Sequence, residues 1–447
     1  MSSSNKYFLT WEESFQSGPQ RVGGKGWNLG RLVRCGFRVP KGGVLATEAY
    51  NEFVVYNGLR ERIELVSQSI TENNISDETA QYQLQILRAD IVKGSFPPFI
   101  LDQITSMLNN LDLNGKPLAV RSSASVEDSS KASFAGIHDS FLNVRHQNSL
   151  IESIKLCYSS LWSNRAVAYR RKLDINDLDV IPAIVIMEMI NAKAAGVAFT
   201  CDPQTGRPDI AVINANFGLG ESVVNGTVDP DVYYLDTRVW NSKPRIKDKK
   251  PGRKSAVTSL QNNEGTCLVP VRDLARKQVI SDRQIEDLGL LLLRVFDSLG
   301  SGEQHQDVEW VFDGRNFVLV QARPVTKLSR PTLNGLKDQT PIWSNGNYRD
   351  AVPMVQTPLN RRLMQTIINT IHESSCTRIG YFIPEGFQFS RFFNGRLYAN
   401  LSALQWIAYD SFGILPRDHQ VFWGGHQPEI EIRNQNPSWH WQWIITV

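Results

Sequence analysis

Cysteine is scarce in this chain of 447 residues, and the way it is spread excludes two of its common uses. The five cysteines lie far apart and include no C-x-x-C pair: Cys35, Cys157, Cys201, Cys267 and Cys376. Neither a disulfide framework nor a cysteine-ligated zinc site is therefore indicated, and the composition fits a reducing compartment.

Long apolar runs are absent as well. The most apolar stretch, residues 288–296, is interrupted by Arg294 and falls far short of the roughly 18 apolar residues of a membrane-spanning helix. The opening segment, MSSSNKYFLTWEES, lacks the apolar core of a secretory signal. We therefore expect a soluble, cytoplasmic protein with no membrane partner.

Charge of one sign is not in excess. The chain has 48 basic and 45 acidic side chains, and the net charge of +3 does not by itself indicate a nucleic-acid partner. The densest basic stretch, residues 241–254, holds seven basic residues and one acid. It is typical of a solvated excursion between strands, with a polyanion-binding loop as the alternative.

Apolar periodicity predicts a mixed fold, either α+β or α/β. Hydrophobic residues make up 41% of the chain, which excludes wholesale disorder, and the length suggests about three domains. Spacings of three and four predict helices over residues 46–70, 77–94, 149–173 and 282–299. Ser281 is the expected N-cap of the last helix, and Gly300 should lie just past its end. Short apolar runs predict strands over residues 118–120, 181–189, 196–200, 210–214, 232–235 and 317–321.

The first candidate site is VGGKGWNLG, residues 22–30. Glycines let backbone amides approach an anion, and Lys25 supplies a compact positive charge suited to phosphate. The segment matches neither the Walker A pattern nor G-x-G-x-x-G, so a glycine-rich turn without a ligand is the alternative.

The second candidate is Arg121, which directly follows the predicted strand 118–120. A guanidinium at a strand end presents a planar fork that suits phosphoryl oxygens, and Ser122 and Ser123 add hydroxyl donors. The alternative is an arginine in a structural ion pair at a strand edge.

The third candidate is SFAGIHDS, residues 133–140. Small residues around Gly136 could form a flap that folds over phosphates, and a plain β-turn is the alternative. His138 has no partner at metal-ligand spacing, so it is not expected to bind a metal.

The fourth candidate is a hairpin, DVEWVF–DGRN–FVLVQAR, residues 307–323. Its side-chain alternation depends on the loop: a three-residue loop places Glu309 opposite Gln321 and Asp307 opposite Arg323. A two- or four-residue loop would put the two sets on opposite faces. In the first register, two carboxylates and an amide oxygen could hold Mg²⁺, beside an arginine that offsets phosphoryl charge.

Together, two cationic phosphate contacts, a glycine flap and a metal-binding hairpin favour nucleoside-triphosphate chemistry. Five segments in order, VGGKGWNLG, VPKGGVLATEAY, AVRSSASVEDSSKASFAGIHDS, ANFGLGESVVNGTVDPD and DVEWVFDGRNFVLVQARPVT, resemble the pyruvate phosphate dikinase and phosphoenolpyruvate synthase family. The resemblance covers residues 23–326, the N-terminal nucleotide-binding region that rifampicin phosphotransferases share.

The resemblance implies an ATP-grasp fold of class α+β with two subdomains. These would be residues 1–185, with the phosphate-contacting cations and the flap, and 186–326, with the metal-binding hairpin. A linker over 327–341 and a truncated connector region over 342–447 would follow. ATP and Mg²⁺ are the implied ligands.

The family's functional positions carry over residue by residue. Lys25 corresponds to a lysine that contacts ATP phosphates, Arg121 to an arginine that reaches the terminal phosphates, and Arg323 to a further arginine that contacts phosphate; the two arginines are the implied catalytic residues. Gly136 and Ser140 correspond to the flap glycine and hydroxyl. The implied metal ligands are Glu309 and Gln321, with Asp307 beside them.

Two positions depart from the family pattern. Ile137 follows the flap glycine where relatives usually carry glutamine, and Met187 stands where they tend to have glutamine on the central strand. Met187 cannot donate an amide hydrogen bond to adenine, so contacts there would come from the backbone of Met187 and Glu188.

The implied activity is Mg-ATP-dependent phosphoryl transfer to a histidine, as in a phosphoenolpyruvate synthase-like phosphotransferase. No glycine-rich segment ending in serine- or threonine-histidine is present, so the acceptor would lie on a phosphohistidine domain supplied in trans. The alternatives are a non-catalytic nucleotide-binding or regulatory module with a separately encoded partner, and a fragment of a rifampicin-phosphotransferase-like antibiotic kinase.

Overall fold

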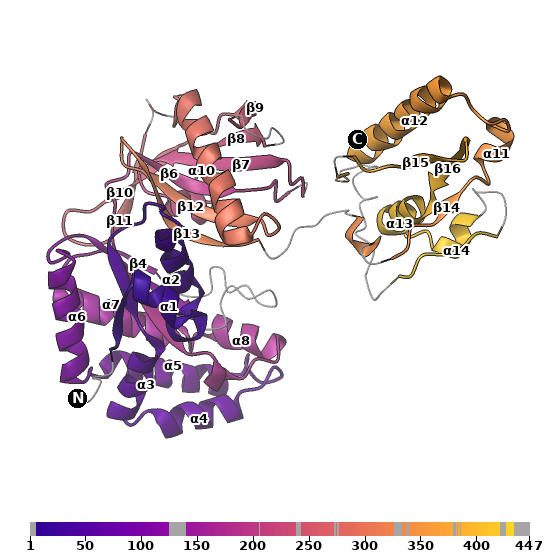
Figure 1. Cartoon of the computed structure of the whole chain (residues 1–447). Coiled ribbons are helices and arrows are strands. Elements are labelled where there is room, and N and C mark those ends of the chain that lie inside the picture. The colour runs from indigo at the N-terminus through magenta and orange to yellow at the C-terminus, as the bar shows by residue number, and fades with distance from the viewer. Residues whose placement is uncertain are drawn as a thin grey trace. The chain divides into compact units, whose positions relative to one another are not determined.

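The computed structural model spans the chain and describes residues 6–432 with gaps at 125–139, 205, 238–242, 272–273, 275–276, 326–332, 337–338, 379–380, 382, 385 and 421–425. The predicted flap, with Gly136, Ile137 and His138, therefore lies outside the described residues, as does the tryptophan-rich end. Two compact units are present (Figure 1): one comprises residues 1–200 and 210–326, and the other 201–209 and 327–447.

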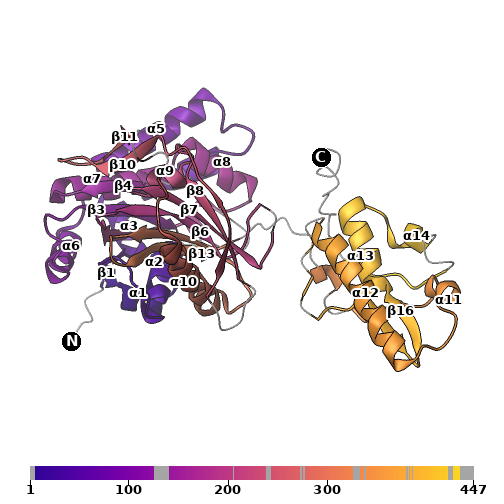
Figure 2. The same cartoon turned by 90° about the horizontal axis from the view of Figure 1, so that it is seen from above.

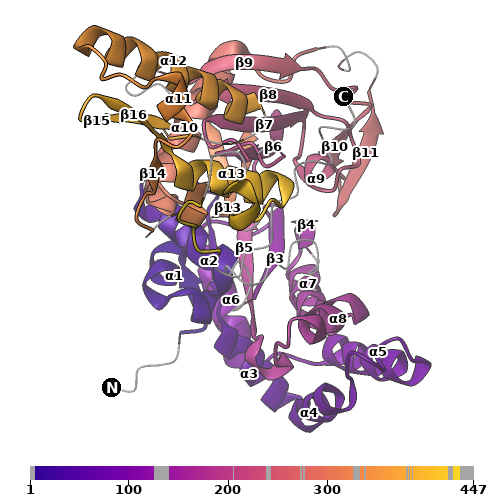
Figure 3. The same cartoon turned by 90° about the vertical axis from the view of Figure 1, so that its right-hand side faces the viewer.

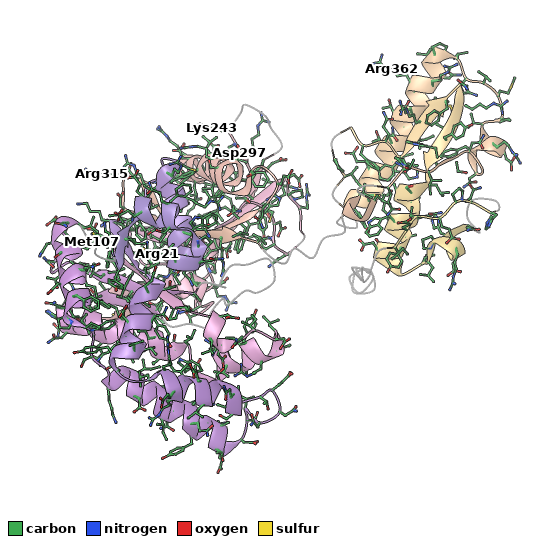
Figure 4. The ribbon with its side chains drawn as sticks, turned by 60° about the horizontal axis from the view of Figure 1, so that its bottom comes forward. Arg21, Met107, Lys243, Asp297, Arg315 and Arg362 are labelled. Carbon is green, nitrogen blue, oxygen red and sulfur yellow. The ribbon has the colours of Figure 1, made fainter. Side chains whose placement is uncertain are left out.

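The first unit contains a five-stranded antiparallel sheet in the order β1-β2-β5-β3-β4. Its strands are β1 Phe8–Thr10, β2 Gly42–Leu45, β3 Leu118–Ala124, β4 Ser140–Val144 and β5 Pro182–Glu188. The helices of this part are α1 Trp11–Ser17, α2 Pro19–Arg34, α3 Thr47–Tyr56, α4 Arg60–Ser69, α5 Glu78–Lys93, α6 Pro98–Asn110, α7 Gln147–Ser160 and α8 Asn164–Lys172. Figure 4 shows Arg21 on α2 and Met107 on α6 among their side chains.

A six-stranded antiparallel sheet forms the rest of this unit, in the order β13-β12-β6-β7-β8-β9. Its strands are β6 Ala194–Phe199, β7 Ile210–Phe217, β8 Asp231–Asp236, β9 Arg245–Lys250, β12 Gln306–Phe312 and β13 Phe317–Pro324. Helix α10, Asp282–Gly300, packs on this sheet through its apolar face (Figures 2 and 3). The short helix α9, Glu221–Val224, and the hairpin of β10, Ala256–Leu260, and β11, Thr266–Pro270, complete it.

One apolar core joins the two sheets. It contains Leu29 of α2, Val185 of β5, Ile213 of β7, Leu288 of α10 and Trp310 of β12, all buried. A second core packs α3 to α7 against the five-stranded sheet. The shared core holds the two sheets in one unit, so side chains from both can line a common cavity.

The second unit is smaller. It holds a three-stranded sheet in the order β14-β16-β15, made of β14 Trp343–Ser344, β15 Ser390–Phe393 and β16 Arg396–Asn400. Its helices are η2 Leu333–Leu336, α11 Tyr348–Ala351, α12 Pro358–Arg378, α13 Leu401–Phe412 and α14 Pro416–His419. Tyr381, Phe389 and Trp406 centre its core.

The mixed helix-and-strand architecture is confirmed, and every predicted strand overlaps an observed one. Ser281 caps α10 as expected: its hydroxyl accepts from the Gln284 amide, and the Gln284 side chain accepts from the Ser281 amide. Gly300, however, is the last helical residue, and Ser301, at φ 53°, takes the C-cap.

Two predicted helices are wrong as single elements. Residues 46–70 form α3 and α4, separated at Gly58, whose φ of +63° a helix cannot continue through. Residues 149–173 form α7 and α8, because Ser163 leaves the helical conformation and its hydroxyl caps the Ala166 amide. Apolar spacing runs through both breaks, so periodicity alone does not reveal them.

The basic stretch 241–254 is not simply an excursion, because it contains strand β9 at an edge of the six-stranded sheet. Lys249 forms an ion pair with Asp282 at 2.9 Å, and Lys243 lies 3.4 Å from Asp287, beside the α10 helix that carries Asp297 (Figure 4). Lysines on an exposed edge strand oppose pairing with another sheet. In the part of the chain that the structure describes, no helix has both the length and the apolar character needed to cross a membrane.

Candidate functional site

A cavity of about 620 Å³ lies in the first unit and draws its walls from both sheets. Eight of the residues predicted from sequence line it: Lys25, Arg121, Ser140, Met187, Glu188, Glu309, Gln321 and Arg323. Asp307 is not among the lining residues, but it contacts one of them, Arg323. Candidate residues nearly 300 positions apart in the sequence thus face one volume.

Lys25 is placed by a kink in α2 rather than by the loop expected from its glycines. Gly23 has φ 69° and ψ 169° inside the helix, and a Cβ there would lie 2.1 Å from the Ser123 carbonyl oxygen. The Ser123 hydroxyl accepts from the Gly26 amide at 3.2 Å and donates to the Val22 carbonyl at 3.0 Å. The glycines therefore serve close packing of α2 on β3, with Lys25 directed to the cavity.

Arg121 lies in the middle of β3, which continues to Ala124 rather than ending at Val120. It pairs with Val185 of β5 on one side and with Ser140 of β4 on the other. Ser122 and Ser123 are buried and are not among the lining residues, so the prediction that they donate to a ligand is wrong. Ser140 is exposed at the start of β4 and does line the cavity.

The hairpin reaches the predicted register by a different route. Phe312 pairs with Phe317, so four residues form the loop, and the expected three-residue loop is wrong. Trp310 pairs with Leu319, but the next residue, Glu309, pairs with Gln321. Val320 is therefore left without a partner position on β12 and forms a β-bulge. Glu309 consequently lies opposite Gln321, and Asp307 opposite Arg323. A four-residue loop alone would place Gln321 on the face opposite to Glu309. The extra residue in the bulge returns these side chains to the same face of the sheet.

Two ion pairs cross this part of the cavity. Arg121 donates to both oxygens of Glu309, at 2.9 and 3.1 Å, and thereby links β3 of one sheet to β12 of the other. Arg323 donates twice to one oxygen of Asp307, at 2.9 and 2.7 Å. The structural ion pair considered as an alternative for Arg121 exists, but it lies in the cavity and not at a strand edge.

Burial and charge act differently on the two carboxyl groups. Burial alone would raise the pKa of Glu309. The positive charge of Arg121, with smaller contributions from Arg323 and Lys25, outweighs burial and lowers that pKa. At Asp307 burial outweighs Arg323, and its pKa is raised. Since Lys25, Arg121 and Arg323 all stabilise the Glu309 carboxylate, the three cations share one electrostatic site.

The residues present fit a hard divalent cation. The Oε1 atom of Gln321 is buried and has no hydrogen-bond partner among the described groups, so an acceptor is held ready beside Glu309. Among the described residues, no group of three or more His, Cys, Asp or Glu side chains is placed so that it could hold a metal ion by itself, so the ligand set would need the amide oxygen and the substrate. Two carboxylates, an amide oxygen and substrate phosphates are the set that Mg²⁺ usually takes.

The rest of the cavity wall is more apolar. Met187 and Glu188 come from the end of β5, Leu219 lies shortly before α9, and Val224 is the last residue of α9. Glu188 lies 3.8 Å from Lys116. Apolar walls with a few polar groups suit a planar ligand such as a nucleobase.

Among the lining residues that were not predicted from sequence are Arg165 of α8, Gly220 and Glu221. The last two belong to FGLGES, where Gly218 has φ +71° and the chain turns into α9. Two glycines so close together could have marked that turn. Nothing local marks Arg165. Within the described residues, no histidine lines the cavity.

A family comparison agrees with this geometry. The family model "Pyruvate phosphate dikinase, AMP/ATP-binding domain" matches residues 19–341. The chain belongs to this family. The match includes Lys25, Arg121 and the whole β12–β13 hairpin.

Several longer relatives carry the name phosphoenolpyruvate synthase. The chain is 31% identical to the "Probable phosphoenolpyruvate synthase" of Methanothermobacter thermautotrophicus over 73% of its length and 47% of the relative. It is 31% identical to the phosphoenolpyruvate synthase of Pyrococcus furiosus (72% and 44%) and 33% identical to that of Aquifex aeolicus (71% and 39%). The chain spans less than half the length of each of these relatives.

Proposed function

We propose that this chain is the Mg-ATP-binding part of a phosphoenolpyruvate synthase-like phosphotransferase, which passes a phosphoryl group of ATP to a histidine of a further domain. In this proposal the first unit is an ATP-grasp fold, with subdomains over residues 1–185 and 186–326. Residues 342–447 would belong to a connector that follows a linker over 327–341.

One observation carries the proposal: Lys25, Arg121, Arg323, Glu309 and Gln321, from three distant segments, line one cavity. A lone glycine-rich turn or a lone ion pair has ordinary structural explanations. Three cations beside two carboxylates and an amide oxygen that has no hydrogen-bond partner among the described residues match the needs of a triphosphate with its metal.

The cations would bind and orient the triphosphate. Guanidinium groups hold phosphoryl oxygens by two-point hydrogen bonds, and Lys25 adds a compact charge. In a loose transition state the charge spreads over the phosphoryl oxygens, so Arg121 and Arg323 would offset it as the bond to the leaving oxygen breaks. Both arginines are therefore proposed as catalytic residues.

Glu309 and Gln321, with Asp307, would hold Mg²⁺. The ion would neutralise phosphate charge and fix the geometry of the transferred group. Ser140 would contact the phosphates beside Gly136, and the backbone of Met187 and Glu188 would face the base.

Calorimetric titration with the non-hydrolysable analogue AMP-PNP and Mg²⁺ tests the proposal. Wild type should bind, and Lys25→Ala and Glu309→Ala should each weaken binding by roughly 10- to 100-fold, the usual loss of a hydrogen bond to a charged group. Arg315→Ala, which removes an exposed cation at the tip of the same hairpin (Figure 4), is the matched control and should bind like wild type. Equal heats for all four proteins would contradict the site.

A further inference from the structure

The carboxylates that are proposed to bind the metal form ion pairs with arginines in this structure. Both oxygens of Glu309 accept hydrogen bonds from Arg121, and one oxygen of Asp307 accepts two from Arg323. The side chains of Arg121 and Glu309 are only 15% and 14% exposed, so water screens this ion pair weakly. A cation that approaches Glu309 therefore competes with a guanidinium that already takes both oxygens.

The local charge also opposes a cation. Arg121, Arg323 and Lys25 all act on Glu309 and lower the pKa of its carboxyl group. A divalent ion that approaches Glu309 alone meets the repulsion of these positive groups. A triphosphate is attracted to the same groups, and once bound it adds negative charge beside them.

A triphosphate offers Arg121 a better partner. Guanidinium groups bind phosphate by the same two-point contact that they make with a carboxylate, and the triphosphate brings several such oxygens. When Arg121 turns to a phosphate, both Glu309 oxygens become available, and Gln321, whose Oε1 has no hydrogen-bond partner among the described residues, lies opposite Glu309 across the hairpin.

From this exchange we propose that the chain accepts a divalent cation only together with a triphosphate, with the ion pair between Arg121 and Glu309 acting as the lock. The inference rests on the proposed function and adds that binding of the metal depends on binding of the nucleotide. Thermodynamic linkage makes the coupling reciprocal, so the metal tightens the nucleotide by the factor by which the nucleotide tightens the metal.

Binding of Mn²⁺ to the purified chain, followed by electron paramagnetic resonance at about pH 8, tests the lock without any catalytic readout. Without nucleotide, wild type and the control Arg315→Gln should bind Mn²⁺ weakly, and AMP-PNP should tighten it by about tenfold or more. Arg121→Gln should bind Mn²⁺ without nucleotide about tenfold more tightly than wild type, and AMP-PNP should add little. Arg121→Lys keeps the charge but loses the two-point contact, so it should fall between them.

The outcomes separate the two proposals. If Arg121→Gln and Arg121→Lys bind Mn²⁺ without nucleotide no better than wild type, or if wild type binds it equally with and without AMP-PNP, the lock is refuted. Calorimetry with AMP-PNP in the presence of EDTA, and again with Mg²⁺, reports nucleotide binding separately. No binding in either condition would refute the proposed function. Circular dichroism identifies a variant that fails to fold, in which case the other Arg121 variant decides.

Discussion

Gly23 of α2 lies against the carbonyl group of Ser123 on β3 more closely than any side chain permits. A Cβ atom at position 23 would stand 2.1 Å from the Ser123 oxygen, and the φ of Gly23 is +69°. This contact joins the helix that carries Lys25 to the strand that carries Arg121 two residues before Ser123. The spacing of the two cations across the cavity depends on it.

Gly23→Ala should both destabilise the protein and weaken nucleotide binding. The positive φ and the contact with backbone atoms leave the added methyl no room, so we expect a loss of about 2–4 kcal/mol. Gly58→Ala is the control, because Gly58 also has positive φ but nothing lies within 4 Å of its Cβ direction, which leaves only about 1 kcal/mol of backbone strain. Thermal unfolding and AMP-PNP calorimetry check both. Equal melting temperatures would show that α2 moves away without cost.

Asp307→Asn and Glu309→Gln, two residues apart on β12, should differ in their effect on stability, and only Glu309→Gln should lower it. The pKa of Glu309 is lowered because Arg121 outweighs burial, so its ionised form stabilises the fold, and Glu309→Gln should lower the melting temperature at neutral pH. The pKa of Asp307 is raised because burial outweighs Arg323, so neutralising it should leave the melting temperature unchanged or raise it. Both variants should bind Mg-AMP-PNP more weakly. Thermal melts without nucleotide at pH 7.5 give the comparison.

The same two groups predict opposite pH trends. The stabilisation from Glu309 is present above its unfolded pKa, near 4.5, and is lost as pH falls through the lower folded value. Asp307 favours folding below its unfolded pKa, near 3.8, and this contribution is lost as pH rises through the higher folded value. Melting curves from pH 3 to 7 should therefore show a shallower acid loss for Glu309→Gln than for wild type, and a steeper one for Asp307→Asn. Parallel curves for all three proteins would contradict the assignment.

Local patterns predicted much of this fold, and long-range packing decided the rest. The capping box of Ser281 and the alternation of β12 and β13 are set by neighbouring residues, so the sequence predicts them. The bulge at Val320 is different: the Leu319 amide donates to the carbonyl of Arg38 at 2.9 Å, a contact far away in sequence. Without that contact, the loop length alone gives the wrong face for Gln321.

The candidate site shows the same division. Lys25 and Arg121 could be proposed because glycine spacing and a strand end are visible in sequence. The role of Ser123 as the partner of Gly26 could not, since it depends on how α2 packs on β3. Arg165 stands out only once α8 is folded beside the cavity.

Asp177→Asn should be among the most destabilising single changes in the first unit. Asp177 and Arg170 are fully buried and lie 2.5 Å apart, and Arg171 also binds both Asp177 oxygens. Burial opposes the charge on Asp177, but the two arginines outweigh it and lower its pKa. Loss of the carboxylate leaves Arg170 buried without its counter-charge, which costs about 3–5 kcal/mol.

Asp174→Asn provides the matched control for that variant. Asp174 is exposed with φ 53°, a conformation that asparagine adopts readily. The melting temperature of the Asp174→Asn variant should therefore stay within about a degree of wild type. The wild-type contribution of Asp177 is present above its unfolded pKa, near 3.8, and is lost as pH falls through the lower folded value. The destabilisation by Asp177→Asn should therefore shrink in acid. A constant difference from pH 3 to 7 would be evidence against the ion pair as its cause.

Gln321→Met should raise stability while it weakens ligand binding. Oε1 of Gln321 is buried without a hydrogen-bond partner among the described residues, and such a group costs about 1–3 kcal/mol. Methionine fills a similar volume without the polar atom, so the melting temperature without ligand should rise, and the affinity for Mg-AMP-PNP should fall by about tenfold or more. Gln306→Met serves as the control. Gln306, on the same strand as Glu309, also has a buried Oε1 without a partner in the described part of the chain, but it does not line the cavity. Its affinity should match wild type. If Gln321→Met binds the metal nucleotide as tightly as Gln306→Met does, the unpartnered oxygen is not a metal ligand, and its burial needs another explanation.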